Sequence, residues 1–359
     1  MYISNEQLLK GKNNFDFIRF FAAFLVFFAH SFPIFTGISM DFDLSKEIFG
    51  IRISSLGVYI FFIISGFLVT QSFYNSKNIF IFFINRILRI LPALIGVTLI
   101  SVIILGLFFS KLNFLDFISD KTTMQFYQNM FIYRSYYYLP DVFLSNPMNS
   151  SINGSIWTIP FEFTCYLILP IVLLIPKLNN KFGILLLTIS CFLAYLFFEN
   201  EINKIVIPFL GIVFSSFFVF FILFLTGVCF YKFKNSINFN YKGLIIILFL
   251  LLLIKFKLIP SLTIVFILPY IVFYFVFSAK INLHNFAKFG DLSYGFYLYA
   301  YPVQQAISAV YYNKLPFLSL FCISFLITLI FANISWFAIE KPALKLKTKL
   351  NFLLKDKLQ

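Results

Sequence analysis

The stretch that decides the fold is FDFIRFFAAFLVFFAHSF, residues 15 to 32. It is apolar and long enough to cross a bilayer, yet it contains Arg19 and His30. An ionisable group in hydrocarbon costs about 3 kcal/mol or more, so such a residue marks a candidate functional site. The spacing of these two residues equals about three helical turns, which places them on one face, about 16 Å apart along the axis. The pattern predicts a polar cavity inside a membrane protein.

The composition of the whole chain also indicates a membrane protein. Of its 359 residues, 61% are hydrophobic and 12% are charged, and soluble proteins carry about twice that charged fraction. Apolar runs of about 20 residues recur from end to end, which is typical of a helical bundle, whereas a β-barrel shows short segments of alternating polarity. We expect an all-α membrane bundle of about ten spans, which form a single domain over residues 1–359. The predicted spans are roughly 14–35, 56–75, 90–110, 156–176, 182–198, 207–231, 243–258, 259–279, 289–310 and 317–338.

The placement of basic residues predicts the orientation. With the N-terminus inside, the Lys and Arg residues of the connections favour the inner side by about two to one, which places both termini in the cytoplasm. The net charge of +14 is therefore explained by the basic residues that orient the chain in the membrane and by attraction to anionic lipid or a cytosolic anion. We expect no nucleic acid partner. The cysteines lie in apolar runs without close pairs, so neither a disulfide nor a metal site is predicted; they are Cys165, Cys191, Cys229 and Cys322.

Arg19 and His30 are the first candidates for chemistry. Histidine is the usual side chain for general acid–base work near neutral pH, and arginine suits carboxylate, phosphate or oxyanion partners. Asp16 lies one turn before Arg19 and is placed to pair with it. The alternative is that Arg19 extends to the inner membrane interface and His30 is a satisfied core residue.

Two further motifs carry charge. NRILRILPAL, residues 85 to 94, places Arg86 and Arg89 on one helix face, where they would grip phosphate groups or simply anchor the helix on the inner side. SIWTIPFEFTCYLILP, residues 155 to 170, places Glu162 about two turns into a span, at a depth similar to that of His30. A carboxylate beside an imidazole fixes its tautomer and raises its basicity. The alternative for Glu162 is a protonated side chain held by hydrogen bonds.

Other polar positions are less specific. Ser65 and Gly66 lie in an apolar span, where small residues usually indicate close helix packing rather than catalysis. Residues 289 to 305 include Tyr294 and Gln304, which are expected to face a cavity or other helices. The outer connection, residues 111 to 155, is rich in tyrosine, which suits either sugar binding or an interfacial aromatic belt.

Together these motifs resemble acyltransferase family 3, integral-membrane enzymes that modify bacterial surface polysaccharides. The first span matches the family's pattern of Arg, ten residues and His. GVYIFFIISGFL, FFINRILRILPAL, SIWTIPFEFTCYL and IEKPAL follow in the family's order. One departure is YLYAYP, residues 297 to 302, where Ala300 replaces a histidine that many members carry. This departure leaves His30 as the main candidate for acid–base chemistry. Many relatives also carry an extra extracytoplasmic domain after the bundle, and we expect none here.

The resemblance implies transfer of an acyl group, with acetyl the expected one, from cytosolic acyl-CoA (acetyl-CoA) to a sugar hydroxyl of a cell-surface or lipid-linked polysaccharide. His30, Arg19 and Glu162 would be catalytic, and Arg86 and Arg89 would bind the CoA phosphates. No metal is expected. The implied setting is a bacterial plasma membrane in the cell envelope, with a glycan acceptor, membrane lipid and other polysaccharide-assembly proteins as partners. Candidate substrate contacts are Trp157, Tyr166, Ser65, Tyr294 and Gln304.

The leading alternative is a proton-coupled transporter or a lipid-linked sugar flippase. Buried Arg, His and Glu side chains would serve equally well as a proton relay. Transporters are often built from inverted repeats with broken helices, and no such symmetry is detectable in the sequence. A scaffold without activity is a third reading, which the alignment of Arg19 with His30 disfavours.

Overall fold

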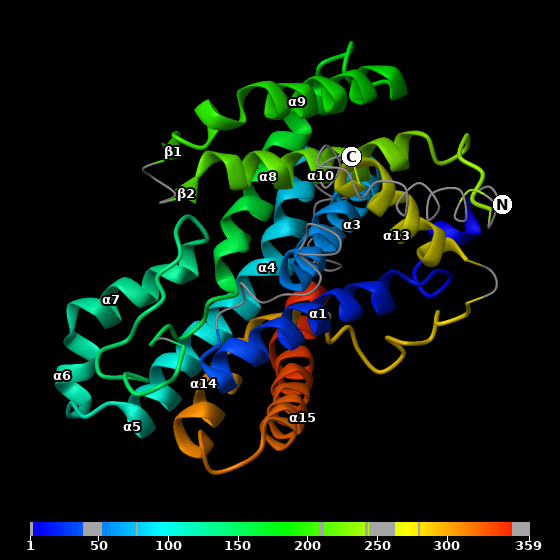
Figure 1. Ribbon diagram of the computed structural model, residues 1–359. Helices are drawn as coiled ribbons and strands as arrows, with labels where there is room; N and C mark the ends of the chain where they lie inside the picture. The colour runs from blue at the N-terminus through cyan, green and yellow to red at the C-terminus, as the bar shows by residue number, and fades with distance from the viewer. Residues whose placement is uncertain are drawn as a thin grey trace. The chain divides into compact units, whose positions relative to one another are not determined.

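The computed structural model describes residues 3–38, 52–76, 78–148, 150–207, 212–240, 243, 263–278 and 281–346 (Figure 1). The described part of the chain is mostly helical, and 7 of its helical segments are long and apolar enough to cross a membrane. The predicted helical membrane fold is therefore confirmed, while the number of ten spans and the cytoplasmic termini stay predictions. The seven segments are Phe15–Thr36, Ile53–Asn75, Ile79–Phe109, Ile156–Leu174, Lys181–Ile202, Phe214–Lys232 and Phe317–Leu346.

Two more predicted spans coincide with described helices that fall outside this group of seven. The apolar helix Val265–Phe277 lies within predicted span 259–279, and α14 (Ser293–Tyr311) matches predicted span 289–310. Predicted span 243–258 lies outside the described residues except for Gly243.

The secondary structure elements follow the apolar segments closely. The helices of the first half are α1 (Phe15–Thr36), α3 (Ile53–Asn75), α4 (Ile79–Ile100), α5 (Gly106–Phe109), α6 (Phe114–Ser119), α7 (Lys121–Tyr127) and α8 (Ile159–Leu174). Those of the second half are α9 (Lys181–Ile202), α10 (Phe214–Lys232), α13 (Leu268–Phe277), α14 (Ser293–Tyr311) and α15 (Phe317–Ser335). Short 3-10 helices are η1 (Glu6–Leu8), η4 (Gln128–Phe131) and η5 (Ile156–Thr158). Wider π turns are η3 (Ser101–Leu105), η6 (Thr263–Ile267) and η7 (Trp336–Glu340).

Two span boundaries differ from the sequence prediction. The predicted span 207–231 begins as a helix only at Phe214, because β1 (Val206–Ile207) pairs antiparallel with β2 (Ile212–Val213) just before it. These strand residues are β-branched, which favours extended backbone. The predicted span 90–110 begins earlier, at Ile79, because the side chain of Asn78 caps α4 by accepting a hydrogen bond from the Ile81 amide at 2.8 Å.

The chain divides into two compact units. Unit 1 comprises Met1–Ala22, Leu44–Lys77 and Thr164–Phe289, and unit 2 comprises Ala23–Asp43, Asn78–Phe163 and Gly290–Gln359. The expectation of a single functional domain over the whole chain stays a prediction.

Close packing of α3 against α10 holds unit 1 together. A Cβ atom on Gly66 would lie 1.9 Å from the carbonyl oxygen of Phe224, and one on Gly227 would lie 2.1 Å from that of Ile63. Small residues allow two helix backbones to approach this closely, which is how transmembrane helices commonly associate. The sequence-based interpretation of Gly66 as a packing residue is confirmed.

Replacing Gly66 with alanine is expected to destabilise the protein by about 1–3 kcal/mol, because the added methyl group meets a backbone atom that cannot rotate away. Thermal unfolding in detergent, followed by circular dichroism, measures the effect. Gly96→Ala is the matched control, since its Cβ would meet only the flexible end of the Ile339 side chain, at 2.6 Å. Equal melting temperatures for the Gly66→Ala protein and the wild type would contradict this account of the α3–α10 contact.

In unit 2, α14 is the central buried helix. It packs along α15, and the two are drawn side by side in orange and red (Figure 1). Most α14 residues are buried, including the polar Gln304, Gln305 and Ser308. Because buried polar groups require hydrogen-bond partners, this helix is where the polar contacts of unit 2 are concentrated.

Candidate functional site

The candidate site of unit 2 is built on one face of α14. Its polar side chains Tyr294, Tyr297, Tyr301, Gln304 and Ser308 recur at intervals of three or four positions, so they share a face of the helix. We call this set the α14 polar face. The predicted site residues that belong to unit 2 are His30, Arg86, Arg89, Trp157, Glu162, Tyr294 and Gln304, while Arg19, Ser65 and Tyr166 belong to unit 1.

His30 lies against the α14 polar face. Its imidazole packs edge-on against the Tyr301 ring, with ring centroids 5.2 Å apart and planes at 78°. The Gln304 amide donates to the Phe27 carbonyl at 2.9 Å and to the Ser31 hydroxyl at 2.7 Å. These two hydrogen bonds hold α1 on either side of His30 in the sequence, so α14 fixes the position of the imidazole.

Glu162 lies near α14 at Tyr297, one helical turn before the Tyr301 ring that contacts His30. The half-buried carboxylate interacts electrostatically with the Tyr297 hydroxyl. That hydroxyl donates to the Ser155 carbonyl at 2.6 Å and lies 2.8 Å from the Thr158 hydroxyl. Because Tyr297 and Tyr301 are four residues apart, they lie about 6 Å apart along the axis. Neighbouring turns of α14 therefore contact His30 and the segment that carries Glu162.

The segment that precedes Glu162, residues 146–148 and 150–158, is fixed onto α14. The Asn146 amide donates to the Gln305 carbonyl and to the Gln305 side-chain oxygen at 3.0 and 2.7 Å. The Gln305 amide donates to the Ser151 carbonyl at 2.8 Å, and the Asn153 amide donates to the Leu298 carbonyl at 2.8 Å. The end of the predicted outer connection is therefore an ordered wall of this site, and Trp157 extends from it onto Phe161 with ring centroids 5.6 Å apart.

Arg89 is part of a largely buried ion cluster at the start of α14. Its guanidinium contacts the Asp291 carboxylate at 2.7 Å and the Glu340 carboxylate at 3.8 Å. The side chains of Arg89, Asp291 and Glu340 are 16%, 7% and 2% exposed. Hydroxyl groups complete the cluster, since Ser293 donates to Asp291 at 2.6 Å and Ser335 donates to Glu340 at 3.0 Å.

The cluster joins three separate parts of unit 2: α4, the start of α14 and η7. Tyr294 reinforces it, because its ring lies 5.7 Å from the Arg89 guanidinium carbon and its hydroxyl donates to the Ile90 carbonyl at 3.1 Å. Sequence reasoning did not pair Arg89 with Asp291 and Glu340. The signal available was a pair of isolated acids at the ends of apolar segments, each needing a buried counter-charge.

In unit 1, the predicted site residues form local contacts. Arg19 lies 3.9 Å from the Asp16 carboxylate, so the predicted pairing one turn apart is confirmed. The Ser65 and Tyr166 hydroxyls are 3.4 Å apart and join α3 to α8. Catalytic or substrate contacts for these residues stay predictions.

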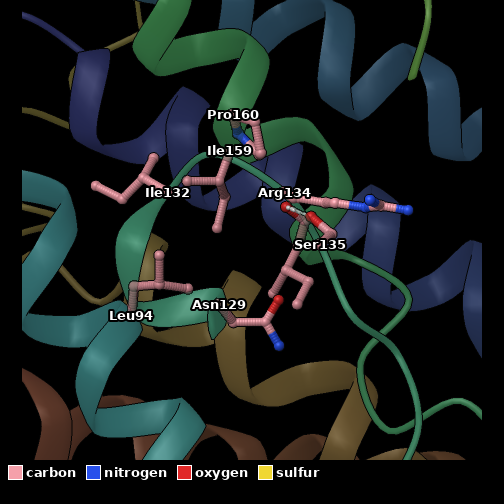
Figure 2. Close-up of a pocket in the computed structure, with 8 residues that line it drawn as sticks. Leu94, Asn129, Ile132, Arg134, Ser135, Ile159 and Pro160 are labelled. Atoms are coloured by element: carbon pink, nitrogen blue, oxygen red, sulfur yellow. Dashed lines mark hydrogen bonds between the residues drawn. The ribbon is translucent and has the colours of Figure 1, made fainter. Parts of the chain in front are cut away.

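Unit 2 also contains a small hollow (Figure 2). It has room for about one water molecule, far less than the volume of about 300–1,000 Å³ that is usual for a small-molecule site. In the part of the chain that the structure describes, no three His, Cys, Asp or Glu side chains gather as a metal would require. The hollow is lined by Leu94, Asn129, Ile132, Arg134, Ser135, Ile156, Ile159 and Pro160.

Comparison with known proteins relates this site to an enzyme family. The family model described as "Acyltransferase domain" matches residues 12–336. "Nodulation protein 10" of Rhizobium leguminosarum bv. viciae is 28% identical, covering 97% of this chain and 97% of that protein. "O-acetyl transferase" of Shigella phage Sf6 is 24% identical, covering 92% of this chain and 95% of that protein. No solved structure matches at the same level of significance.

The family match includes both α1 and α14, the helices that meet at His30. It agrees with the resemblance found in the motifs of the sequence. The chain belongs to this acyltransferase family, and it is an integral-membrane O-acyltransferase.

Proposed function

We propose that this protein transfers an acetyl group from acetyl-CoA to a sugar hydroxyl of a cell-surface or lipid-linked polysaccharide. The observation that carries the proposal is the placement of His30 against the α14 polar face. There an ionisable side chain on an apolar helix lies among hydroxyl and amide groups. The printed name of the Shigella phage relative supports acetyl as the group transferred.

In the proposed reaction, His30 removes the proton from the acceptor hydroxyl as its oxygen attacks the thioester carbonyl. A carbon–oxygen bond forms, the carbon–sulfur bond breaks, and the proton passes from the imidazole to the sulfur of CoA. General base catalysis of this kind contributes about 10²–10⁴-fold to a rate. Arg19, on the same helix as His30, orients the donor, and Glu162 supports the acid–base chemistry.

The two arginines of α4, Arg86 and Arg89, are proposed to bind the CoA phosphates, for which a guanidinium is well suited. Arg89 also neutralises Asp291 and Glu340, so we assign it the further role of holding α14 in place. Trp157, Tyr294 and Gln304 are proposed as contacts of the acceptor. Ser65 and Tyr166 are proposed as contacts of the substrate within unit 1.

The proposed setting is the plasma membrane of a bacterium, where the enzyme would work with other polysaccharide-assembly proteins. The seven apolar helices support the membrane part of this proposal. A proton-coupled transporter or sugar flippase is the competing function, because the same buried groups would relay protons.

The decisive experiment reconstitutes the purified protein in liposomes with radiolabelled acetyl-CoA and a polysaccharide acceptor. We expect the label to appear on the sugar as an ester that mild alkali releases. The same liposomes, loaded with a pH-sensitive dye, report solute-driven proton uptake. Proton uptake without labelled sugar would replace the proposed function with transport.

A further inference from the structure

A second arginine site lies apart from the cluster around Arg89. Arg134 is exposed, and its guanidinium carbon lies 5.4 Å from the centre of the Tyr136 ring. Its charge also acts on the hydroxyls of Tyr133 and Tyr137. Among the residues that the structure describes, no carboxylate lies within 4.0 Å of Arg134, in contrast to Arg89. The guanidinium therefore lies against the Tyr136 ring and is open to solvent.

The backbone around Arg134 is built to hold this position. The Asn129 side chain accepts from the Tyr136 amide at 2.8 Å and donates to the Tyr136 carbonyl at 2.9 Å, which closes the loop between them. The Tyr133 hydroxyl donates to the Gln128 side chain. Ile132 has a φ of 62°, a conformation that is uncommon for a β-branched residue and is kept only where the surroundings fix it.

The hollow of unit 2 lies directly beside this arginine. Figure 2 shows the Arg134 guanidinium extending from the rim, while Ser135 is tied to the opposite wall through the Ile156 carbonyl at 3.3 Å. That wall, Ile156 to Pro160, contains Trp157 and leads into the turn of α8 that carries Glu162. A group held at the rim would therefore lie next to the segment assigned to the acceptor side.

The side chains around Arg134 match an acidic sugar. A guanidinium forms paired, charge-assisted hydrogen bonds with a carboxylate or phosphate, and tyrosine offers an apolar ring together with a hydroxyl. Burial raises the pKa of Tyr137, and a tyrosine hydroxyl is in any case protonated at neutral pH, where it is able to donate.

We propose that Arg134, with Tyr133, Tyr136 and Tyr137, recognises a carboxylate or phosphate on the acceptor, so that the enzyme selects anionic sugars. This inference rests on the proposed function and names the chemical class of its acceptor. A lipid headgroup phosphate offers the same chemistry, and the test below separates the two sources.

The test measures binding without the acetyl donor, by titration calorimetry of the full-length protein in nanodiscs of neutral phosphatidylcholine. The probes are glucose, glucuronate and glucose 6-phosphate. We expect the wild type to bind the two anionic probes at least about tenfold more tightly than glucose, because the guanidinium forms stronger hydrogen bonds with a carboxylate or phosphate than with a neutral hydroxyl. Arg134→Ala should remove this difference. Lys111→Ala, which removes one exposed positive charge from the same outer connection, should keep it.

Two results would overturn the inference. One is a wild type that binds the three probes equally or not at all. The other is an equal loss in the Arg134→Ala and Lys111→Ala proteins, which would indicate general charge attraction. Nanodiscs that contain phosphatidylglycerol form the second arm. If the wild type loses its preference for the anionic probes there, the lipid phosphate competes for Arg134, and the site would be assigned to lipid headgroups instead of the acceptor.

The outcome is separable from that of the proposed function. Preferential binding of the anionic probes without acetyl transfer to any sugar would refute the proposed function and leave the anion site in place. Equal acetyl transfer to neutral and anionic sugars, by both the wild type and Arg134→Ala, would support the proposed function and refute the selection of anionic acceptors.

Discussion

The His30→Ala protein is expected to transfer acetyl groups about 100- to 10,000-fold more slowly than the wild type, which is the usual contribution of a positioned general base. The imidazole is the group that the structure holds against Tyr301, between the two α1 positions that Gln304 anchors. Alanine removes the base without adding bulk. Initial rates in proteoliposomes, at saturating acetyl-CoA and acceptor, measure the effect on kcat.

Ser31→Ala is the control for this variant. It removes a neighbouring polar group, the acceptor of the Gln304 amide at 2.7 Å, but leaves the imidazole in place. A loss of activity that came only from loosening α1 against α14 would appear in both variants. Full activity in a folded His30→Ala protein would remove His30 from the mechanism.

The Arg89→Ala protein is expected to lose about 3–5 kcal/mol of stability, the usual cost of removing one partner from a buried ion pair. Arg89 is the counter-charge for the carboxylates of Asp291 and Glu340, which are 7% and 2% exposed. Without it, two acids remain in a site with little access to water. Thermal unfolding in mild detergent, followed by tryptophan fluorescence, measures the loss.

An exposed ion pair provides the comparison. Lys204 lies 3.0 Å from Glu201, with side chains 70% and 68% exposed, so Lys204→Ala should cost less than about 1 kcal/mol. Adding Asp291→Asn and Glu340→Gln to Arg89→Ala should recover part of the lost stability, because the uncompensated charges are then gone. If Arg89→Ala proved no more destabilising than Lys204→Ala, the cluster would not hold α4, α14 and η7 together.

The sequence predicts local features of this protein well. Apolar runs predict helices because lipid provides no partner for backbone amides and carbonyls, so a spanning segment must satisfy its own hydrogen bonds. The pairing of Arg19 with Asp16 follows from helical spacing alone. The small residue at Gly66 predicts a close helix contact, but the sequence does not identify Gly227 as its partner.

The sequence does not predict which distant residues meet. Arg89 is 202 positions from Asp291, and only the packing of α4, α14 and η7 brings them together. The same holds for Tyr301, which contacts both His30 and Ser151. The hairpin that ends at Val213 was missed because its apolar, β-branched residues continue the apolar run of the following helix. Helical periodicity does not distinguish a short apolar strand from a helix over so few residues.

The central claim is that the imidazole of His30 removes the proton of the acceptor hydroxyl. The pH dependence of single-turnover acetyl transfer, compared between the wild type and His30→Ala, tests it most directly. A general base works only when deprotonated, so the wild-type rate should fall as the pH is lowered through the range in which this imidazole takes up a proton. The account predicts that the acidic limb disappears in His30→Ala, which leaves a slow, nearly pH-independent rate. The same acidic limb in both proteins would contradict it.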